Sequence, residues 1–271
     1  MSAAIEQGNY DQEILLDSGA FTAWSKGDAV KLSSLVKIYR TFIKKYESKT
    51  KAIWLINLDR IPGEKNRDPT AQEITDAIKE SDTNFSILTH EFGTRILPVF
   101  HQGESQLRLN EIVQQAPYIC VSPRNDLPEH LRVKWSRAVH DKLPADIRTH
   151  GLATTGIEMS TTVPWHSTDS ATWVHAALFG EIFLNVGQGG APKRIAISSQ
   201  HPGRFTRGRH YDSTNLRQQA WIKQRAEEKG FNIEELRQQM SARAAFSMLE
   251  FIDWNYAKNV NVLNTPSLFD L

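Results

Sequence analysis

Polar side chains suited to acid–base chemistry and to binding a planar ring follow the predicted strands at regular intervals. Asp17-Ser18-Gly19 comes directly after the apolar run at 14–16, and similar groups follow later apolar runs. The later groups are Asp59, His101-Gln102-Gly103, Ser122 with Arg124 and Asn125, His150-Gly151, and Asp169. Each group alone is typical of a turn, a helix cap or a hydrogen-bonded histidine. Together they predict one active site, because loops after successive parallel strands converge on one rim.

The first and last carboxylates of this series indicate the chemistry. Asp17 and Asp169 would face each other across the rim, and paired carboxylates are typical of reactions at an anomeric carbon. One attacks C1′ of a sugar or stabilises positive charge there, while the other moves a proton to or from a departing base. Asp59 and Gln102 offer acceptors and a donor for the edge of that base. The glycines of these loops would let a flat ring approach the backbone: Gly19, Gly103 and Gly151.

The elements that must position these residues follow a βα pattern, in which short apolar runs alternate with segments of helical apolar spacing. We expect strands at 14–16, 52–58, 96–100, 118–121, 147–150 and 165–168, with 181–186 and 193–198 forming a hairpin or the last strands. We expect helices at 32–46, 104–116 and 128–142, and two more within 214–260. Another helix should begin with Asp68 as its N-cap and Pro69 at its first position, and end at Gly93. The helix at 128–142 should bury Leu131, Trp135, Ala138 and Val139. The pattern predicts an α/β fold, a (β/α)8 TIM-barrel-like domain, incomplete or modified, with C-terminal helices.

The composition is that of one globular domain over 1–271. The chain has 40% hydrophobic residues, a net charge of +1 and no linker rich in Pro, Gly or Ser. Cys120 is the only cysteine, which excludes an internal disulfide and a zinc cage built from several cysteines. We therefore expect a cytoplasmic protein without a signal peptide, a membrane span, a cofactor or a bound metal.

Several short motifs, spread in order over residues 14–175, carry a resemblance to a known family. They are LLDSGAF at 15–21, INLD at 56–59, VFHQGE at 99–104, SPRND at 122–126, and HGLATTGIEMSTTVPWHSTDSATW at 150–173. The chain resembles the tRNA-guanine transglycosylase family, and most closely its small phage and mobile-element relatives that modify DNA. The family exchanges guanine in a nucleic acid for a 7-deazaguanine through a covalent glycosyl-enzyme.

The resemblance implies roles for individual residues. Asp169 would be the nucleophile and Asp17 the acid/base partner, while Asp59, Gln102 and the Ser122 loop would contact the heterocycle. We expect the other rim residues to bind substrate as well: Ser18, Gly19, His101, Gly103, Arg124, Asn125, His150 and Gly151. The incoming partner would be a 7-deazaguanine base such as a preQ-type precursor. A homodimer or a partner in a modification complex is also compatible with the resemblance.

One departure from the family affects the choice of nucleic acid. Family members that act on tRNA hold a structural zinc ion with three cysteines and a histidine after the nucleophile. This chain has no cysteine after Cys120. The zinc subdomain is therefore expected to be absent, which favours DNA over tRNA as the substrate.

The segment 182–211 is a candidate nucleic-acid contact. It contains no acidic residue, and its basic residues are Lys193, Arg194, Arg204, Arg207 and Arg209. Such a segment could hold phosphates beside the rim, although a solvated loop is the alternative interpretation. In the following helices, the aromatic residues Phe251, Trp254 and Tyr256 are more typical of helix packing than of a stacking platform for bases.

Three other functions are compatible with the same residues. Asp17, Asp59, His101, His150 and Asp169 could ligate a divalent ion in a metal-dependent barrel hydrolase, although the chain has no HxH or HExxH pair. Water could complete the reaction, as in a base-releasing N-glycosylase or nucleosidase. The third alternative is a barrel without catalytic activity that serves as a binding domain in a larger defence or modification assembly.

Overall fold

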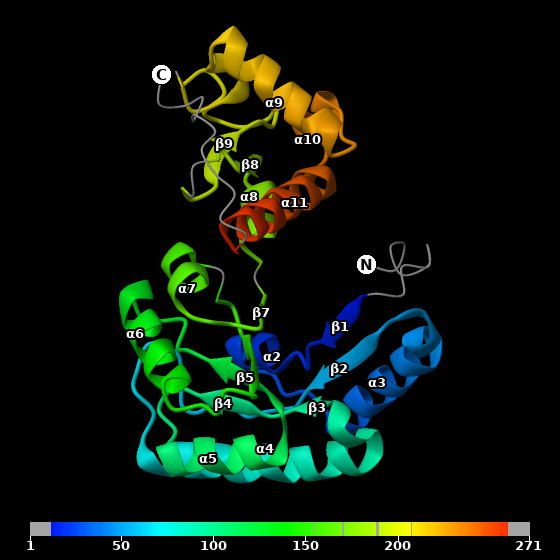
Figure 1. Ribbon diagram of the computed structural model, residues 1–271, viewed down its shortest axis with the longest axis vertical. Coiled ribbons are helices and arrows are strands. Elements are labelled where there is room, and N and C mark those ends of the chain that lie inside the picture. The colour runs from blue at the N-terminus through cyan, green and yellow to red at the C-terminus, as the bar shows by residue number, and fades with distance from the viewer. Residues whose placement is uncertain (1–11, 155, 170, 188–189, 207, 260–271) are drawn as a thin grey trace. The chain divides into compact units, whose positions relative to one another are not determined.

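The computed structural model describes residues 12–154, 156–169, 171–187, 190–206 and 208–259 (Figure 1). These residues group into two compact units, the first ending at Asp169 and the second beginning after it. The sequence-based expectation of one domain stays a prediction. Within the described residues, no helix combines the length and the apolar character needed to span a membrane.

The first unit contains parallel strands in the order of the chain. Strands β1 (Glu13–Leu16), β2 (Ala52–Ile56) and β3 (Ile96–Leu97) pair in the order β1-β2-β3. Strands β4 (Val99–His101), β5 (Tyr118–Ser122), β6 (Arg148–Gly151) and β7 (Ser167–Thr168) pair in the order β4-β5-β6-β7. Every one of these pairings is parallel. Each strand lies at or within two residues of a predicted one.

Pro98 divides what the sequence predicts as one strand at 96–100. Proline has no N–H to donate to a ladder, so the run is split into β3, which pairs with β2, and β4, which pairs with β5. The carbonyls beside the break are still used, because Leu97 O accepts from Asn57 N (2.9 Å) and Pro98 O accepts from Cys120 N (2.8 Å). The two ladders therefore meet at Pro98.

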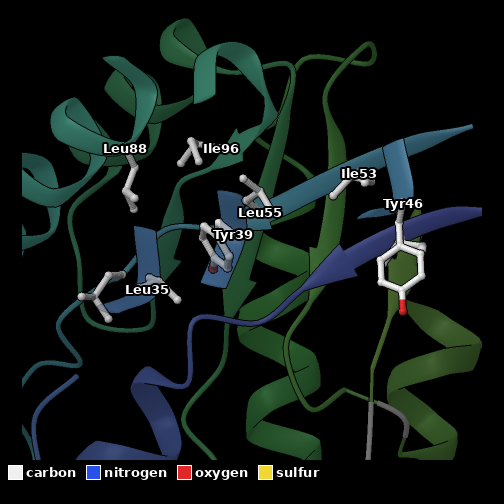
Figure 2. Close-up of a cluster of buried hydrophobic side chains, with 9 residues drawn as sticks. Leu35, Tyr39, Tyr46, Ile53, Leu55, Leu88 and Ile96 are labelled. Carbon is white, nitrogen blue, oxygen red and sulfur yellow. The ribbon is translucent and has the colours of Figure 1, made fainter. Parts of the chain in front are cut away.

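Helices follow the strands of the first unit, as βα units require (Figure 1). They are α2 (Ala20–Lys26), α3 (Leu32–Tyr46), α4 (Ala71–Phe92), α5 (Gln106–Gln115), α6 (Glu129–His140) and α7 (Ile157–Thr162), with 3-10 turns η1 (Glu47–Lys49) and η2 (Gly93–Arg95). Figure 2 shows Leu35 and Tyr39 of α3 against Leu55 of β2 and Ile96 of β3, in a buried apolar cluster. The Tyr39 hydroxyl donates to Ile56 O at 2.7 Å, which fixes α3 against the end of β2.

Two details of the predicted helices are wrong. Helix α4 is capped by Thr70, not Asp68, because Thr70 Oγ1 accepts from Glu73 N (3.2 Å) while the Glu73 carboxylate accepts from Thr70 N (2.8 Å). Helix α6 leaves Leu131 and Ala138 exposed. Its buried stripe instead runs through Val133, Ser136 and Val139, at spacings of three residues.

The second unit combines an antiparallel pair with helices. Strands β8 (Glu181–Leu184) and β9 (Lys193–Ala196) pair antiparallel, which is the hairpin alternative of the sequence interpretation. The helices are α8 (Thr172–Leu178), α9 (Leu216–Glu228), α10 (Ile233–Gln238) and α11 (Met240–Asn259), with a 3-10 turn η3 (Tyr211–Ser213). The region 214–260 thus holds a helix more than predicted, because it is interrupted twice. Gly230 (φ 79°) follows α9, and Gln239, with an extended backbone, separates α10 from α11.

The structure is therefore a mixed α/β protein with parallel sheets and helices. The ladders found among the described residues do not test closure into an eight-stranded barrel, which stays a prediction.

Candidate active site

Asp17 and Asp169 line one cavity of about 350 Å³ in the first unit. Asp17 follows the last residue of β1, and Asp169 follows the last residue of β7. Residues two apart on a strand point to the same face of a sheet, so Leu15 and Ser167 accompany these carboxylates. The other lining residues are Glu13, Trp54, Ile56, Tyr118, His150, His166 and Thr168. The structure thus brings together the two carboxylates that the sequence singles out.

The cavity raises the pKa of both carboxylates. Burial raises the pKa of Asp17, and the negative charges of Asp169 and Asp59 raise it further. Burial against the cavity walls likewise raises the pKa of Asp169, although 58% of its side chain is open to solvent. The backbone N–H of Ala153 opposes this effect by donating to Asp169 Oδ1 at 2.7 Å. A raised pKa suits Asp17 as a proton donor, whereas a nucleophile at Asp169 needs hydrogen bonds that stabilise the anion.

His150 lies between the strands that end at this cavity. Its Nδ1 is 2.6 Å from Ser167 Oγ, and its Nε2 lies 3.6 Å from Asp169 Oδ1. Burial lowers the pKa of His150 to about 4, so the ring is neutral near pH 7. The next residue, Gly151, is crowded, because a Cβ there would overlap the Thr154 hydroxyl and lie 2.9 Å from the Trp165 ring.

Asp59 and His101 form a buried pair on neighbouring strand ends. His101 Nε2 is 2.7 Å from Asp59 Oδ2, and each side chain is 6% exposed. Burial opposes protonation of His101, but the hydrogen bond and the charge of Asp59 overcome it and raise the pKa of the imidazole. Asp59 lines a different cavity, of about 450 Å³. One of its carboxylate oxygens is therefore already engaged inside the protein.

A third cavity, of about 350 Å³, gathers most of the remaining predicted site residues. His101, Gln102, Ser122, Arg124 and Asn125 line it together with the aromatic residues Phe21 and Trp24. Many of these polar groups form hydrogen bonds or ion pairs with other residues of the protein.

Internal hydrogen bonds occupy several of these polar groups. Gln102 Oε1 accepts from Arg124 N at 3.0 Å, and Gln102 N donates to Ser122 O at 3.0 Å. The Arg124 guanidinium pairs with Asp126 at 2.7 Å and with Asp68. The predicted site residues that line a cavity are therefore divided among three cavities of the first unit, and the Asp59–His101 pair connects two of them.

Three of the predicted substrate-binding residues have local roles in the backbone. Ser18 is buried and its Oγ accepts from Ala20 N at 3.4 Å. Gly19 (φ 79°) is the N-cap residue of α2, and Gly103 (φ 112°) lies in the turn after β4. These positive φ angles explain the glycines without a ligand.

The sequence interpretation missed Tyr118, Ser167 and Ala153, which contact His150 and Asp169 directly or through one hydroxyl. Ser167 could have been found from strand periodicity, since it lies two residues before Asp169 and so faces the same side. Tyr118 is on β5, two strands away from β7, so nothing local in the sequence indicates that its hydroxyl meets Ser167. Ala153 contributes a backbone N–H, which leaves no signature in a sequence.

The basic segment of the second unit is partly neutralised by acids at its two ends. Arg194 pairs with Glu181 at 3.1 Å, and Arg204 pairs with Asp212 at 2.6 Å. Lys193 and Arg209 are exposed, and Arg207 lies outside the described residues. Phosphate binding by this segment stays a prediction.

The aromatic residues of α11 pack as the sequence predicts. Trp254 is 3% exposed, and the Phe251 ring lies 4.9 Å from the Phe183 ring and 5.8 Å from the Trp173 ring. The side chain of Tyr256 lies outside what the structure describes.

Comparisons with protein-family models and with curated proteins find no match to this chain. Among the side chains that the structure describes, no three His, Cys, Asp or Glu residues form a group that could hold a metal ion.

Proposed function

We propose that this protein is a base-exchange glycosyltransferase that replaces guanine in a nucleic acid by a 7-deazaguanine. The observation that carries the proposal is the shared cavity of Asp17 and Asp169, two carboxylates delivered by the ends of β1 and β7. Paired carboxylates with perturbed pKa values in one cavity are typical of catalysis at an anomeric carbon. We further propose that the parallel strands belong to a TIM-barrel-like domain.

The first half of the reaction forms a covalent intermediate. The Asp169 carboxylate attacks C1′ as the bond between C1′ and N9 of guanine breaks, and the electron pair of that bond stays on the base. Asp17, whose pKa is raised by burial and by neighbouring carboxylates, donates a proton to the departing guanine. The sugar is then held as an ester of Asp169.

The second half reverses these steps with another base. Asp17, now ionised, takes a proton from the incoming 7-deazaguanine, whose N9 attacks C1′ and displaces the Asp169 carboxylate. Both catalytic groups return to their starting protonation states. Two displacements at C1′ also retain the configuration of the sugar.

The base would be held by the neighbouring strand ends. Asp59 has a carboxylate oxygen besides the one paired with His101, and the Gln102 side chain keeps its NH₂ donors when its Oε1 accepts from Arg124 N. Phe21 and Trp24 line the adjoining cavity and could stack on a nucleotide. Within the basic segment, Lys193, Arg194 and Arg209 are exposed and are candidates for phosphate contacts, although Arg194 also pairs with Glu181.

If the resemblance holds, the lack of cysteine ligands for the zinc ion of tRNA-acting family members favours DNA as the nucleic acid. The single cysteine, which allows no internal disulfide, favours the cytoplasm as the location. A second function, base release by hydrolysis, is favoured by one observation. The Asp169 side chain is 58% exposed, so water could reach its ester before a second base does.

Nucleoside mass spectrometry tests the proposal. DNA and tRNA would be extracted from cells that make 7-deazaguanine bases and express the wild-type protein, Asp169→Asn or Asp76→Asn, and then digested to nucleosides. Asp76 is an exposed aspartate of α4 and serves as the matched control. We expect a 7-deazaguanine nucleoside in DNA with the wild type and with Asp76→Asn, but not with Asp169→Asn. Abasic sites without the modified nucleoside would indicate the glycosylase, and unchanged nucleic acids would refute both functions.

A further inference from the structure

A chain of hydrogen bonds approaches Asp169 from the interior of the first unit. Strand β6 pairs with β7 so that His150 lies opposite Ser167. Ser167 Oγ is 2.6 Å from His150 Nδ1 and 2.6 Å from the Tyr118 hydroxyl. One serine hydroxyl therefore connects the tyrosine of β5 to the histidine of β6.

The hydrogens available to these groups determine the tautomer of His150. Burial raises the pKa of Tyr118, so its hydroxyl keeps its hydrogen and can donate it to Ser167. Ser167 has a single hydrogen, which it then donates to His150 Nδ1. With Nδ1 as acceptor, the neutral imidazole carries its hydrogen on Nε2. The reverse arrangement would leave the tyrosine hydrogen without an acceptor among these three groups, and donation to Ser167 Oγ from both neighbours would leave the serine hydrogen without one.

The Nε2 atom that carries this hydrogen is buried and has no hydrogen-bond partner among the described residues. The His150 side chain is 4% exposed, and Nε2 lies 3.6 Å from Asp169 Oδ1. This distance is slightly too long for a hydrogen bond and too short to admit a water molecule between the two atoms. A small rotation of the exposed Asp169 side chain would close the contact.

We propose that His150, oriented by Ser167 and Tyr118, is a positioning residue that donates its Nε2–H to Asp169 Oδ1 and so presents Asp169 Oδ2 to C1′. The inference rests on the proposed function, since it assigns a role in forming the glycosyl-enzyme. Ala153 N already donates to the same oxygen at 2.7 Å. Both contacts thus hold Oδ1, which assigns the attack to Oδ2.

The neutral state of the donor matters for the nucleophile. Burial raises the pKa of Asp169 and so disfavours its anion, and an N–H donor from the protein counteracts that effect. An imidazolium could transfer its proton to Asp169 and end its nucleophilicity, whereas a neutral imidazole keeps its proton. During the attack, Oδ2 bonds to C1′, and the bond from C1′ to N9 breaks with its electron pair on the base. His150 keeps its Nε2 proton throughout this step.

Substitution of His150 by an amide residue distinguishes the roles of its two ring nitrogens. His150→Gln places an N–H donor near the position of Nε2, whereas His150→Asn retains a polar group only near Nδ1. The matched control is His140→Gln, because both nitrogens of His140 are partnered, by Ser136 O and Thr149 Oγ1, and it does not line the cavity. Single-turnover formation of the glycosyl-enzyme would be measured with a guanine-containing oligodeoxynucleotide.

A hydrogen bond to a charged group contributes about 1.5–3 kcal/mol, which corresponds to about 10- to 100-fold in rate. We expect His150→Asn and Ser167→Ala to slow adduct formation by about this factor without weakening DNA binding, and His150→Gln to restore most of the rate. Unchanged adduct formation by folded His150→Asn would refute this role. A wild-type protein that forms no adduct would refute the proposed function, and this role with it.

Nitrogen NMR of the ¹⁵N-histidine-labelled wild-type protein checks the tautomer without any variant. We expect the His150 signals at pH 7 to show a protonated Nε2 and an unprotonated Nδ1. Ser167→Ala should shift this tautomer balance. A protonated Nδ1 in the wild type would overturn the inference even if the substituted proteins do not fold.

Discussion

Burial of His150 makes the stability of the first unit depend on pH in a defined window. Burial lowers the pKa of His150 from 6.5 to about 4 in the folded protein. Between these two values the unfolded chain binds a proton that the folded chain does not, so stability is present above pH 6.5 and is lost as pH falls. Integrating this difference from pH 7 to pH 5 gives a loss of about 2 kcal/mol from this one residue.

The assay compares urea unfolding of the full chain at pH 7 and pH 5, for the wild type and for His150→Gln. Hydrogen exchange by mass spectrometry, read on peptides from β5 and β6, reports the first unit separately from the second. The wild type should lose about 2 kcal/mol more than His150→Gln over this interval. The control His130→Gln removes an exposed histidine of α6 and should behave as the wild type. Equal pH dependence in the wild type and His150→Gln would refute the reasoning.

Further predictions concern the packing and the chemistry of the first unit. Gly151→Ala should lower the free energy of unfolding by about 1–3 kcal/mol in urea titrations, because its Cβ would overlap the Thr154 hydroxyl and lie 2.9 Å from the Trp165 ring. An unchanged midpoint would contradict the crowding. His101→Ala should lower it by about 3–5 kcal/mol, since the buried Asp59 carboxylate loses its partner, and a loss under about 1 kcal/mol would argue against a charged pair. Asp17→Asn should slow the incorporation of labelled guanine into DNA by about 10²–10⁴-fold while the adduct still forms, and a wild-type rate would exclude Asp17 as the acid.

The positions of the strands and of the long helices could be predicted because their signals are local. Helix α3 shows one apolar stripe over four turns, and β5 is a short apolar run, so periodicity alone locates both. The predicted N-cap of α4 is wrong for a local reason as well. Asp68 and Thr70 are both good capping residues, and only the Glu73 side chain three residues after Thr70 favours the second.

The candidate site could be predicted only in part. The sequence indicates which residues follow strands, and so it points to Asp17 and Asp169. It does not reveal which strand residues lie opposite each other, and the bond from His150 to Ser167 depends on that register. The composition of the basic segment likewise does not reveal the pairing of Arg204 with Asp212, since this acid lies just outside the segment.

Trapping of the covalent intermediate tests the central claim most directly. The wild-type protein would be mixed with a guanine-containing oligodeoxynucleotide, denatured, and digested for peptide mass spectrometry. We predict a denaturant-resistant adduct that maps to Asp169, with guanine released in equal amount, and no adduct with Asp169→Asn. An adduct formed by Asp169→Asn, or one that maps to a different residue in the wild type, would contradict the account.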